Sequence, residues 1–451
     1  MLAAHRRSVN WINHGAFSLL NQVSAVLLGF GSIFFLVRII PPSEVGVWVL
    51  FTSVGGILET LRIGFIRTPF VSMLVVADER DYSKIILNSL ILHILLTCLI
   101  GVLLIASAEL LAKFWYAENL ELLFYIYSVN SFVLIAFFHF EYLLQSKLEF
   151  KAIFIANFVR LFILFAYILG YYIIDKQPSL VELASVQIFS TIVASVFSFQ
   201  LIKGQMPTLT RSLFDIAILK KLFHLGKYTF GTNISSMLIK NTDSWMIGRL
   251  ISTAGVAMYN PALRISNIVE VPTLAIANIV FPQVGNKMRE SGVEGVQAIY
   301  YKSVSLILAV MLPVVLPVYF MAEFIIMILF GAEYMEAVPI LQVTIFYTVL
   351  VPFSRQFGTI MDALQMPKLN FYISLLMAIL NVVLNYYLLQ SFGVIGAAYS
   401  TVISFCFIFI VCQAILYYKF KINTLKVFVE LISWYTYGWH FLRSWLSGKV
   451  S

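Results

Sequence analysis

Charged side chains are scarce in this chain. Asp, Glu, Lys and Arg make up 12% of its 451 residues, whereas 61% of the residues are hydrophobic. Soluble domains carry roughly 25% charged residues, because charge keeps their surfaces hydrated. The shortage excludes a soluble protein and predicts an integral membrane protein.

Patterns that hold disulfides, metals or nucleotides are missing. The three cysteines lie inside apolar runs without paired spacing, so neither a disulfide framework nor a cysteine zinc site is expected. The pair Gly226-Lys227 lacks the earlier glycine of a phosphate loop, and there is no Asp-x-Asp pair for a metal-bound sugar nucleotide. We therefore expect no cofactor, no metal, no ATPase domain and no enzymatic activity.

Long apolar runs are abundant. Twelve of them are long enough to cross a bilayer core of about 30 Å as helices. They are 15–37, 45–66, 85–107, 120–144, 151–174, 180–202, 226–250, 254–281, 300–320, 334–358, 370–390 and 394–418.

Lys and Arg are distributed unevenly between these runs. With a cytoplasmic N-terminus, 21 of the 30 fall on the cytoplasmic side, and the outer side holds only Arg38, Lys113, Lys176 and Arg249. This bias predicts that both termini are cytoplasmic. It also accounts for the net charge of +8 without a nucleic-acid partner.

The first apolar runs are repeated later in the chain. At an offset of 211 residues Arg38 falls on Arg249 and Glu59 on Glu270, and nine of the 56 pairs between 15–70 and 226–281 are identical. The repeat predicts an all-α membrane protein with about 12 transmembrane helices in two pseudo-symmetric six-helix lobes. The expected parts are an N-lobe at 1–204 with an interfacial N-terminus, a cytoplasmic amphipathic connector at 205–225, a C-lobe at 226–419, and an interfacial tail or extra span at 420–451.

Polar residues form stripes on two of the apolar runs. On the seventh run, Asn233, Lys240 and Asp243 share an arc of about 80°, and on the eighth a second stripe covers about 120°. This second stripe holds Asn260, Arg264, Asn267 and Glu270. A charge at the bilayer centre costs at least about 2.5–3.5 kcal/mol, so such stripes predict a water-filled cavity between the lobes. Uncharged stripes alone would favour helix–helix hydrogen bonding.

Several of these charges have simpler explanations. Glu59 and Arg62 are three residues apart and can neutralise each other, and Lys240 and Asp243 have the same spacing. Either pair would then be an internal ion pair.

Other polar residues in the runs also have structural explanations. Arg38 and Arg249 lie near the outer ends of their runs, where their side chains can reach the membrane surface. His93 is expected to be packed, and His139 and Glu141 are expected to face different sides of one helix.

Three motifs carry a resemblance to a known family. They are Arg38-Ile-Ile-Pro-Pro-Ser-Glu-Val-Gly-Val-Trp48 between the first two runs, Ala257-Met-Tyr-Asn-Pro-Ala-Leu-Arg264-Ile in the eighth, and Phe281-Pro282 at its end. With twelve predicted helices, the chain resembles the polysaccharide-type flippases of the multidrug/oligosaccharidyl-lipid/polysaccharide exporter superfamily. It departs from the pattern at Arg62-Ile-Gly64, where many members carry an acid before the glycine.

The resemblance implies a transporter in a bacterial cytoplasmic membrane. Its substrate would be an undecaprenyl-pyrophosphate-linked oligosaccharide, moved to the periplasmic leaflet by alternating access for surface polysaccharide. Expected partners are membrane lipids, H⁺ or Na⁺ as coupling ion, and polymerase or chain-length proteins. We expect ion coupling at Glu270, Asp243 and Glu59, and substrate contacts at Arg38, Arg62, Asn233, Lys240, Arg249, Asn260, Arg264 and Asn267.

Three other functions remain open from the sequence. A multidrug cation exporter of the same fold would carry isolated acids in its cavity rather than shared basic and acidic stripes. A flippase for a peptidoglycan precursor is the second alternative. A membrane-embedded polysaccharide polymerase or ligase would need a large external loop with catalytic charge, and the sequence contains no such loop.

Overall fold

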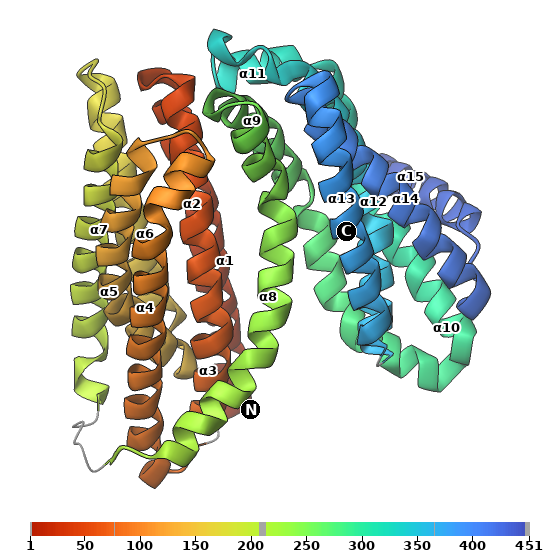
Figure 1. Ribbon diagram of the computed structural model, residues 1–451. Helices are drawn as coiled ribbons and strands as arrows, with labels where there is room; N and C mark the ends of the chain where they lie inside the picture. The colour runs from red at the N-terminus through yellow and green to blue at the C-terminus, as the bar shows by residue number, and fades with distance from the viewer. Residues whose placement is uncertain (1, 76, 207–212, 365, 447–451) are drawn as a thin grey trace. The chain divides into compact units, whose positions relative to one another are not determined.

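The computed structural model describes residues 2–75, 77–206, 213–364 and 366–446, and this part of the chain is helical almost throughout (Figure 1). Ten of its helices are long and apolar enough to span a membrane, or eleven if one bent pair is counted as a span. The chain is therefore a multi-pass all-α membrane protein, as predicted. It divides into two compact units, Met1–Ala254 and Gly255–Ser451.

The first unit contains eight α-helices and a π-helical turn. They are α1 (Leu2–Ile39), α2 (Pro42–Arg62), the π-turn η1 (Ile63–Arg67), α3 (Thr68–Val75), α4 (Glu79–Phe114), α5 (Asn119–Ser146), α6 (Phe150–Ile173), α7 (Leu180–Ile202) and α8 (Ile216–Leu250). A short 3₁₀ turn, η2 (Lys203–Gln205), follows α7.

Helices of the first unit pack as an elongated bundle (Figure 1). Helix α1 lies against α6, α5 lies between α4 and α7, and α8 packs along α2 and η1. The bundle has a core of large buried side chains, among them Phe70, Phe137 and Tyr142. Many apolar side chains on the outside, such as Leu99 and Val102 on α4, are exposed. An outer surface of this kind is what a helix bundle presents to lipid.

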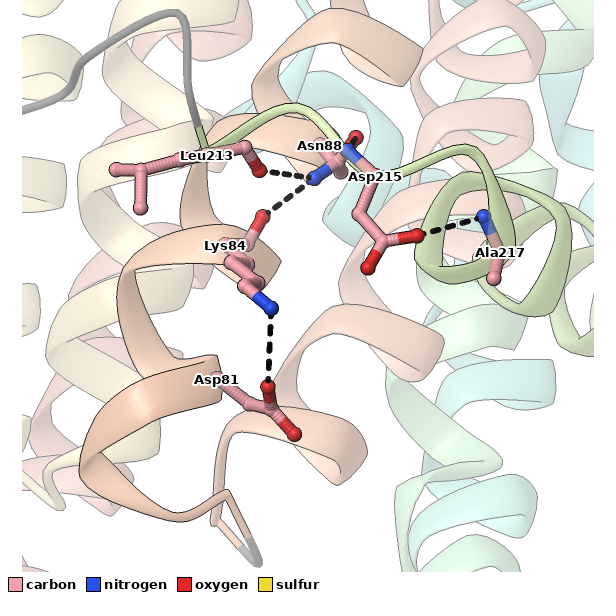
Figure 2. A network of polar contacts seen from close by, with 6 residues as sticks. All are labelled: Asp81, Lys84, Asn88, Leu213, Asp215 and Ala217. Carbon is pink, nitrogen blue, oxygen red and sulfur yellow. Dashed lines mark hydrogen bonds and ion pairs between the residues drawn. The ribbon is translucent and has the colours of Figure 1, made fainter.

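The connector before α8 is shorter than predicted, because α8 begins at Ile216 rather than near 226. Asn88 on α4 fixes its end: its side chain donates to the carbonyl oxygen of Leu213 and accepts from the backbone N–H of Asp215, both at 3.1 Å (Figure 2). Asp215 then caps α8 by accepting from the N–H of Ala217 at 2.9 Å. Phe214 and Phe223 are exposed in this stretch, and its predicted role as an amphipathic connector stays a prediction.

The second unit is built from α9 (Thr253–Val269), α10 (Val271–Phe320), α11 (Ala322–Leu329), η4 (Ala332–Tyr334), α12 (Ala337–Ala363), α13 (Pro367–Phe392), α14 (Ile395–Phe420) and α15 (Leu425–Leu446). Helix α12 packs against α10 and α14, and α13 packs against α14. Helix α10 is interrupted at Gly292, whose φ of 59° is one that glycine adopts at little cost.

The C-terminal helix α15 lies against α10. Trp434 donates from Nε1 to Ser305 Oγ at 3.0 Å, and Tyr435 donates to the carbonyl oxygen of Ala309 at 3.1 Å. It is not among the helices apolar enough to span. Whether the tail lies at the interface or forms an extra span stays a prediction.

The observed helices follow most of the predicted spans closely. The run predicted at 226–250 is helical as α8, but it is too polar to count among the ten apolar spans. The run at 254–281 bends by 42° between α9 and Val271–Phe281, next to Pro272, which cannot donate to the preceding turn. The compact units divide after Ala254, so α8 is counted with the first, and the predicted lobe boundary at 205–225 stays a prediction.

Candidate functional site

Two of the predicted site residues are arginines at the ends of helices. Arg38 closes α1, with its guanidinium carbon 3.7 Å from the ring centroid of Phe34 and a hydrogen bond to the carbonyl oxygen of Phe34. Arg249 closes α8, where it lies 5.2 Å from the ring of Phe114 and 4.7 Å from that of Tyr116. Both positions combine a cation–π contact with the negative end of a helix. This environment stabilises a cation near the membrane surface.

The polar stripe predicted for the eighth run forms one face of α9. Asn260 and Arg264 are half-buried and Asn267 is exposed, whereas Ala262 and Ile265 on the other side of the helix are buried. Arg264 donates from Nε to Asn260 Oδ1 at 2.6 Å, one turn earlier. That bond uses the Nε proton and fixes the orientation of the guanidinium. The terminal nitrogens remain available for a bidentate interaction with an anion.

Glu270 lies at the break between α9 and α10. It is half-buried, its N–H donates to the carbonyl oxygen of Ser266, and its own carbonyl accepts from Thr273, both at 3.0 Å. A carboxylate at a helix break lies where a small backbone rotation would change its surroundings.

The stripe of the seventh run lies on α8. Lys240 is exposed, and Asp243 is buried. The side chain of Asn233 lies outside the described part of the structure. Further along α8, Trp245 donates from Nε1 to Ser53 Oγ at 2.9 Å, and its carbonyl oxygen accepts from Trp115 Nε1 at 3.1 Å. These bonds hold the C-terminal end of α8 against α2 and the end of α4.

Glu59 and Arg62 lie together on the last turns of α2, but they do not neutralise each other. Within the described residues, no salt bridge joins them. Glu59 is half-buried, whereas Arg62 is completely buried and Nε, Nη1 and Nη2 have no hydrogen-bond partner in that same part of the chain. The ion-pair interpretation of this spacing is therefore wrong. A substrate contact at Arg62 would require its side chain to become accessible.

The sequence missed a group of buried polar residues beside Arg62. His93 and His139 are 0% and 2% exposed, and neither ring nitrogen of either has a hydrogen-bond partner among the described residues. His139 stacks on Phe70 with ring centroids 5.2 Å apart, and His93 stacks on Tyr142 at 6.5 Å. The available signal was the recurrence of polar residues at helical spacing, His93 and Thr97 on α4 and Ser131, His139 and Tyr142 on α5.

Arg160 on α6 and Glu141 on α5 are further charged residues of this region. Arg160 lies 4.8 Å from the ring centroid of Phe137, and Glu141 accepts from Asn157 Nδ2 at 3.4 Å. Neither forms a salt bridge within the described ranges. Over the same ranges no group of three His, Cys, Asp or Glu residues could hold a metal ion.

Comparison with known families identifies the chain more closely. Residues 35–339, more than half of the sequence, match the family described as polysaccharide biosynthesis protein. The chain belongs to this family. The predicted resemblance to polysaccharide-type members of the superfamily is confirmed.

Two relatives of this polysaccharide biosynthesis family protein have names that indicate a role in glycan biosynthesis. A probable low-salt glycan biosynthesis flippase of Haloferax volcanii is 26% identical over 221 residues, covering 47% of each chain. The teichuronic acid biosynthesis protein of Bacillus subtilis is 24% identical over 310 residues, covering 66% of this chain and 59% of that one. The chain thus spans about half the length of the curated relatives it matches.

Solved structures agree on the fold. The lipid II flippase MurJ, in an inward closed conformation, superposes with a TM-score of 0.75 at 14% identity. The match covers 92% of this chain and 89% of the MurJ chain. An inward-facing multidrug resistance MATE transporter of the MOP superfamily has a TM-score of 0.71 at 17% identity, covering 86% and 92%. The predicted all-α membrane fold is thus shared with these two proteins, and the described residues supply ten or eleven of the twelve predicted spans.

Proposed function

We propose that this protein is a flippase for a lipid-linked glycan, moving the glycan from one leaflet to the other. The observation that carries the proposal is the polar face of α9, where Arg264 donates from Nε to Asn260 and both side chains are half-buried. Membership of a polysaccharide biosynthesis family and the names of the two relatives also support a glycan substrate. The finer proposal is an undecaprenyl-pyrophosphate carrier in a bacterial cytoplasmic membrane.

The chemistry of such a substrate matches the residues on these stripes. A pyrophosphate is anionic and a sugar is rich in hydroxyl groups, so both need charged and amide side chains to cross the apolar core. Arg264 and Lys240 would bind phosphate, while Asn233, Asn260 and Asn267 would offer hydrogen bonds to phosphate or sugar. Arg38 and Arg249 would act nearer the outer surface. The lipid tail can stay in the bilayer while the lobes alternate in access.

Complementation of a flippase-deficient strain tests the proposal. Replacing Arg264 with Gln removes a charged hydrogen-bond donor, which should weaken binding by about 1.5–3 kcal/mol, or roughly tenfold or more. We expect a corresponding loss of surface polysaccharide at matched expression. Lys287→Gln is the control, because Lys287 is exposed and paired with Glu290 at 2.8 Å. Full activity of Arg264→Gln would remove Arg264 as a substrate contact.

A second pair of variants separates the charge of Arg264 from its orientation. Asn260→Ala removes the bond that holds the guanidinium, whereas Asn260→Asp keeps a partner and cancels the positive charge. If the substrate is an anion, Asn260→Asp should reduce the transport rate more than Asn260→Ala does. The reverse order would favour a multidrug cation exporter, for which an added acid is harmless.

The proposal extends to ion coupling through Glu270, with Glu59 as its counterpart in the repeat and Asp243 as a further acid. The position of Glu270 at the break between α9 and α10 supports this, because a moving helix end can change the solvation of its carboxylate. Transport in proteoliposomes under an imposed proton or sodium gradient should lose its gradient dependence in Glu270→Gln. Unchanged dependence would make Glu270 structural. Glu290→Gln, at an exposed ion pair, is the control.

A further inference from the structure

Arg62 is a charged residue in the interior of the first unit without a partner for its charge. Its side chain is 0% exposed, and none of its three nitrogens makes a hydrogen bond within the described structure. Arginine stays protonated in proteins, and breaking the pairing of a buried charge typically costs several kcal/mol. Within the described residues, no side chain accepts a hydrogen bond from the guanidinium, so its charge is left without compensation there.

Donor groups from two neighbouring helices lie in the same region. Several buried side chains of these helices have polar atoms without a hydrogen-bond partner in the described ranges, among them His93 and Thr97 on α4, and Ser131, His139 and Tyr142 on α5. Arg62 lies within electrostatic range of both His93 and Tyr142. Hydroxyl and neutral imidazole groups can each donate one hydrogen bond.

The formal charges of this region do not balance. Three arginines and two glutamates act electrostatically on the hydroxyls of Tyr127 and Tyr142: Arg62, Arg67, Arg160, Glu59 and Glu141. None of the five forms a salt bridge in the described part of the chain. With both histidines neutral, three positive and two negative charges leave one positive charge in excess.

The backbone at Arg62 is also unusual. Arg62 is the last residue of α2 and is followed by the π-turn Ile63–Arg67, a rare conformation that occurs most often at functional sites. The turn is packed tightly, since Gly226 of α8 lies against the backbone of Phe65. A side chain at a rigid turn is held in place rather than free to move to the surface.

We propose that a small monovalent anion of the halide class binds inside the first unit, against the guanidinium of Arg62. One negative charge balances the excess positive charge, whereas phosphate or sulfate would reverse its sign. A compact ion suits this region, because the side chains named above are almost completely buried. His93, Thr97, Ser131, His139 and Tyr142 supply the remaining donors. This site is separate from the polar face of α9 and does not depend on the proposed flippase activity.

Thermal unfolding of the purified full-length protein in detergent tests the proposal. Sodium chloride and sodium bromide are compared with sodium gluconate at equal ionic strength, which separates anion binding from general screening. We expect the unfolding midpoint to rise with halide and saturate, by about 5 °C at a concentration far above the dissociation constant. Arg62→Gln should abolish this rise. Arg355→Gln, which changes an exposed arginine of α12, should retain it.

A second measurement remains informative if Arg62→Gln fails to fold. Anomalous scattering from wild-type crystals grown in bromide should show an ion in hydrogen-bond contact with the Arg62 guanidinium. The proposal is overturned if halide and gluconate give the same unfolding midpoint, if Arg62→Gln keeps the halide response, or if bromide is absent beside Arg62.

Discussion

Gly226 is a residue at which α8 packs closely against the π-turn η1 of the first unit. A β-carbon at this position would lie 2.7 Å from the carbonyl oxygen and 2.9 Å from the α-carbon of Phe65. Both neighbours are backbone atoms of the π-turn, so a larger side chain cannot be accommodated by a rotamer change. The absence of a side chain at Gly226 is what allows α8 to pack against this turn.

Gly226→Ala should therefore destabilise the protein. Overpacking against backbone typically costs about 1–3 kcal/mol, which exceeds the gain of about 0.5–1 kcal/mol from replacing a helical glycine by alanine. Thermal unfolding in detergent measures the difference. Gly170→Ala on α6 is the matched control, because no atom lies within 4 Å of its added β-carbon. Equal midpoints for the two variants would contradict the close packing of α8.

Single residues were the least predictable part of the candidate site. The stripe with Asn260 and Arg264 was predicted because its residues lie on one helix. The helical repeat of about 3.6 residues is enough to show which residues of one helix share a face. The group around Arg62, His93 and His139 was missed because its members come from α2, α4 and α5. Their meeting depends on how helices pack, and one sequence does not record that packing.

Among the elements, the start of α8 is held in place by hydrogen bonds from Asn88 to the stretch before it. The Asn88 side chain is fully buried and makes three bonds, the third being donation to the carbonyl oxygen of Lys84 at 2.8 Å (Figure 2). It thereby satisfies the backbone of Leu213 and Asp215 just before α8 begins. A single amide thus fixes the point at which the chain leaves the connector.

Asn88→Ala should loosen this connection. Unmet backbone groups at Leu213 and Asp215 cost about 1–3 kcal/mol, or recover their bonds by turning to water. Limited trypsin digestion in detergent should then cut faster after Lys220. Asn370→Ala is the control, since Asn370 bonds only to Asp362 in the second unit, at 3.0 and 3.1 Å. An unchanged digestion rate for Asn88→Ala would contradict the anchoring role.

The spanning elements were largely predictable from hydropathy. The predicted runs at 120–144 and 180–202 correspond to α5 and α7 within about two residues at each end, because apolar length is a direct consequence of bilayer thickness. The breaks were less predictable. The π-turn after Arg62 was not predicted, although Pro69, which cannot donate to the carbonyl oxygen of Phe65, follows it by two residues. The bend at Glu270 lies next to Pro272 and has the same chemical cause.

At the level of the whole molecule, the orientation in the membrane is still a prediction. It rests on the uneven distribution of Lys and Arg, which places Lys287 on the cytoplasmic side and Lys176 on the outer side. In a variant without native cysteines, Lys176→Cys should react with an impermeant maleimide in intact cells. Lys287→Cys should react only after lysis. The opposite pattern would invert the topology and the proposed direction of transport.

Both copies of the sequence repeat contain a broken second helix. The second helix of each repeat is broken in its C-terminal half, at η1 in the first copy and at Glu270 in the second. An axis along the membrane normal, relating α1 and α2 to α8 and α9, remains the expectation from the offset of 211 residues.

Flipping by the purified protein tests the central claim most directly. The protein is reconstituted into vesicles with a fluorescent polyprenyl-pyrophosphate-linked oligosaccharide, and access of an external glycosidase or quencher to the inner leaflet pool is followed with time. We predict that the wild type makes the whole pool accessible, that Arg264→Gln slows this about tenfold or more, and that a cationic dye is not transported. Vesicles in which half of the glycolipid stays protected, as in protein-free controls, would contradict the proposed function.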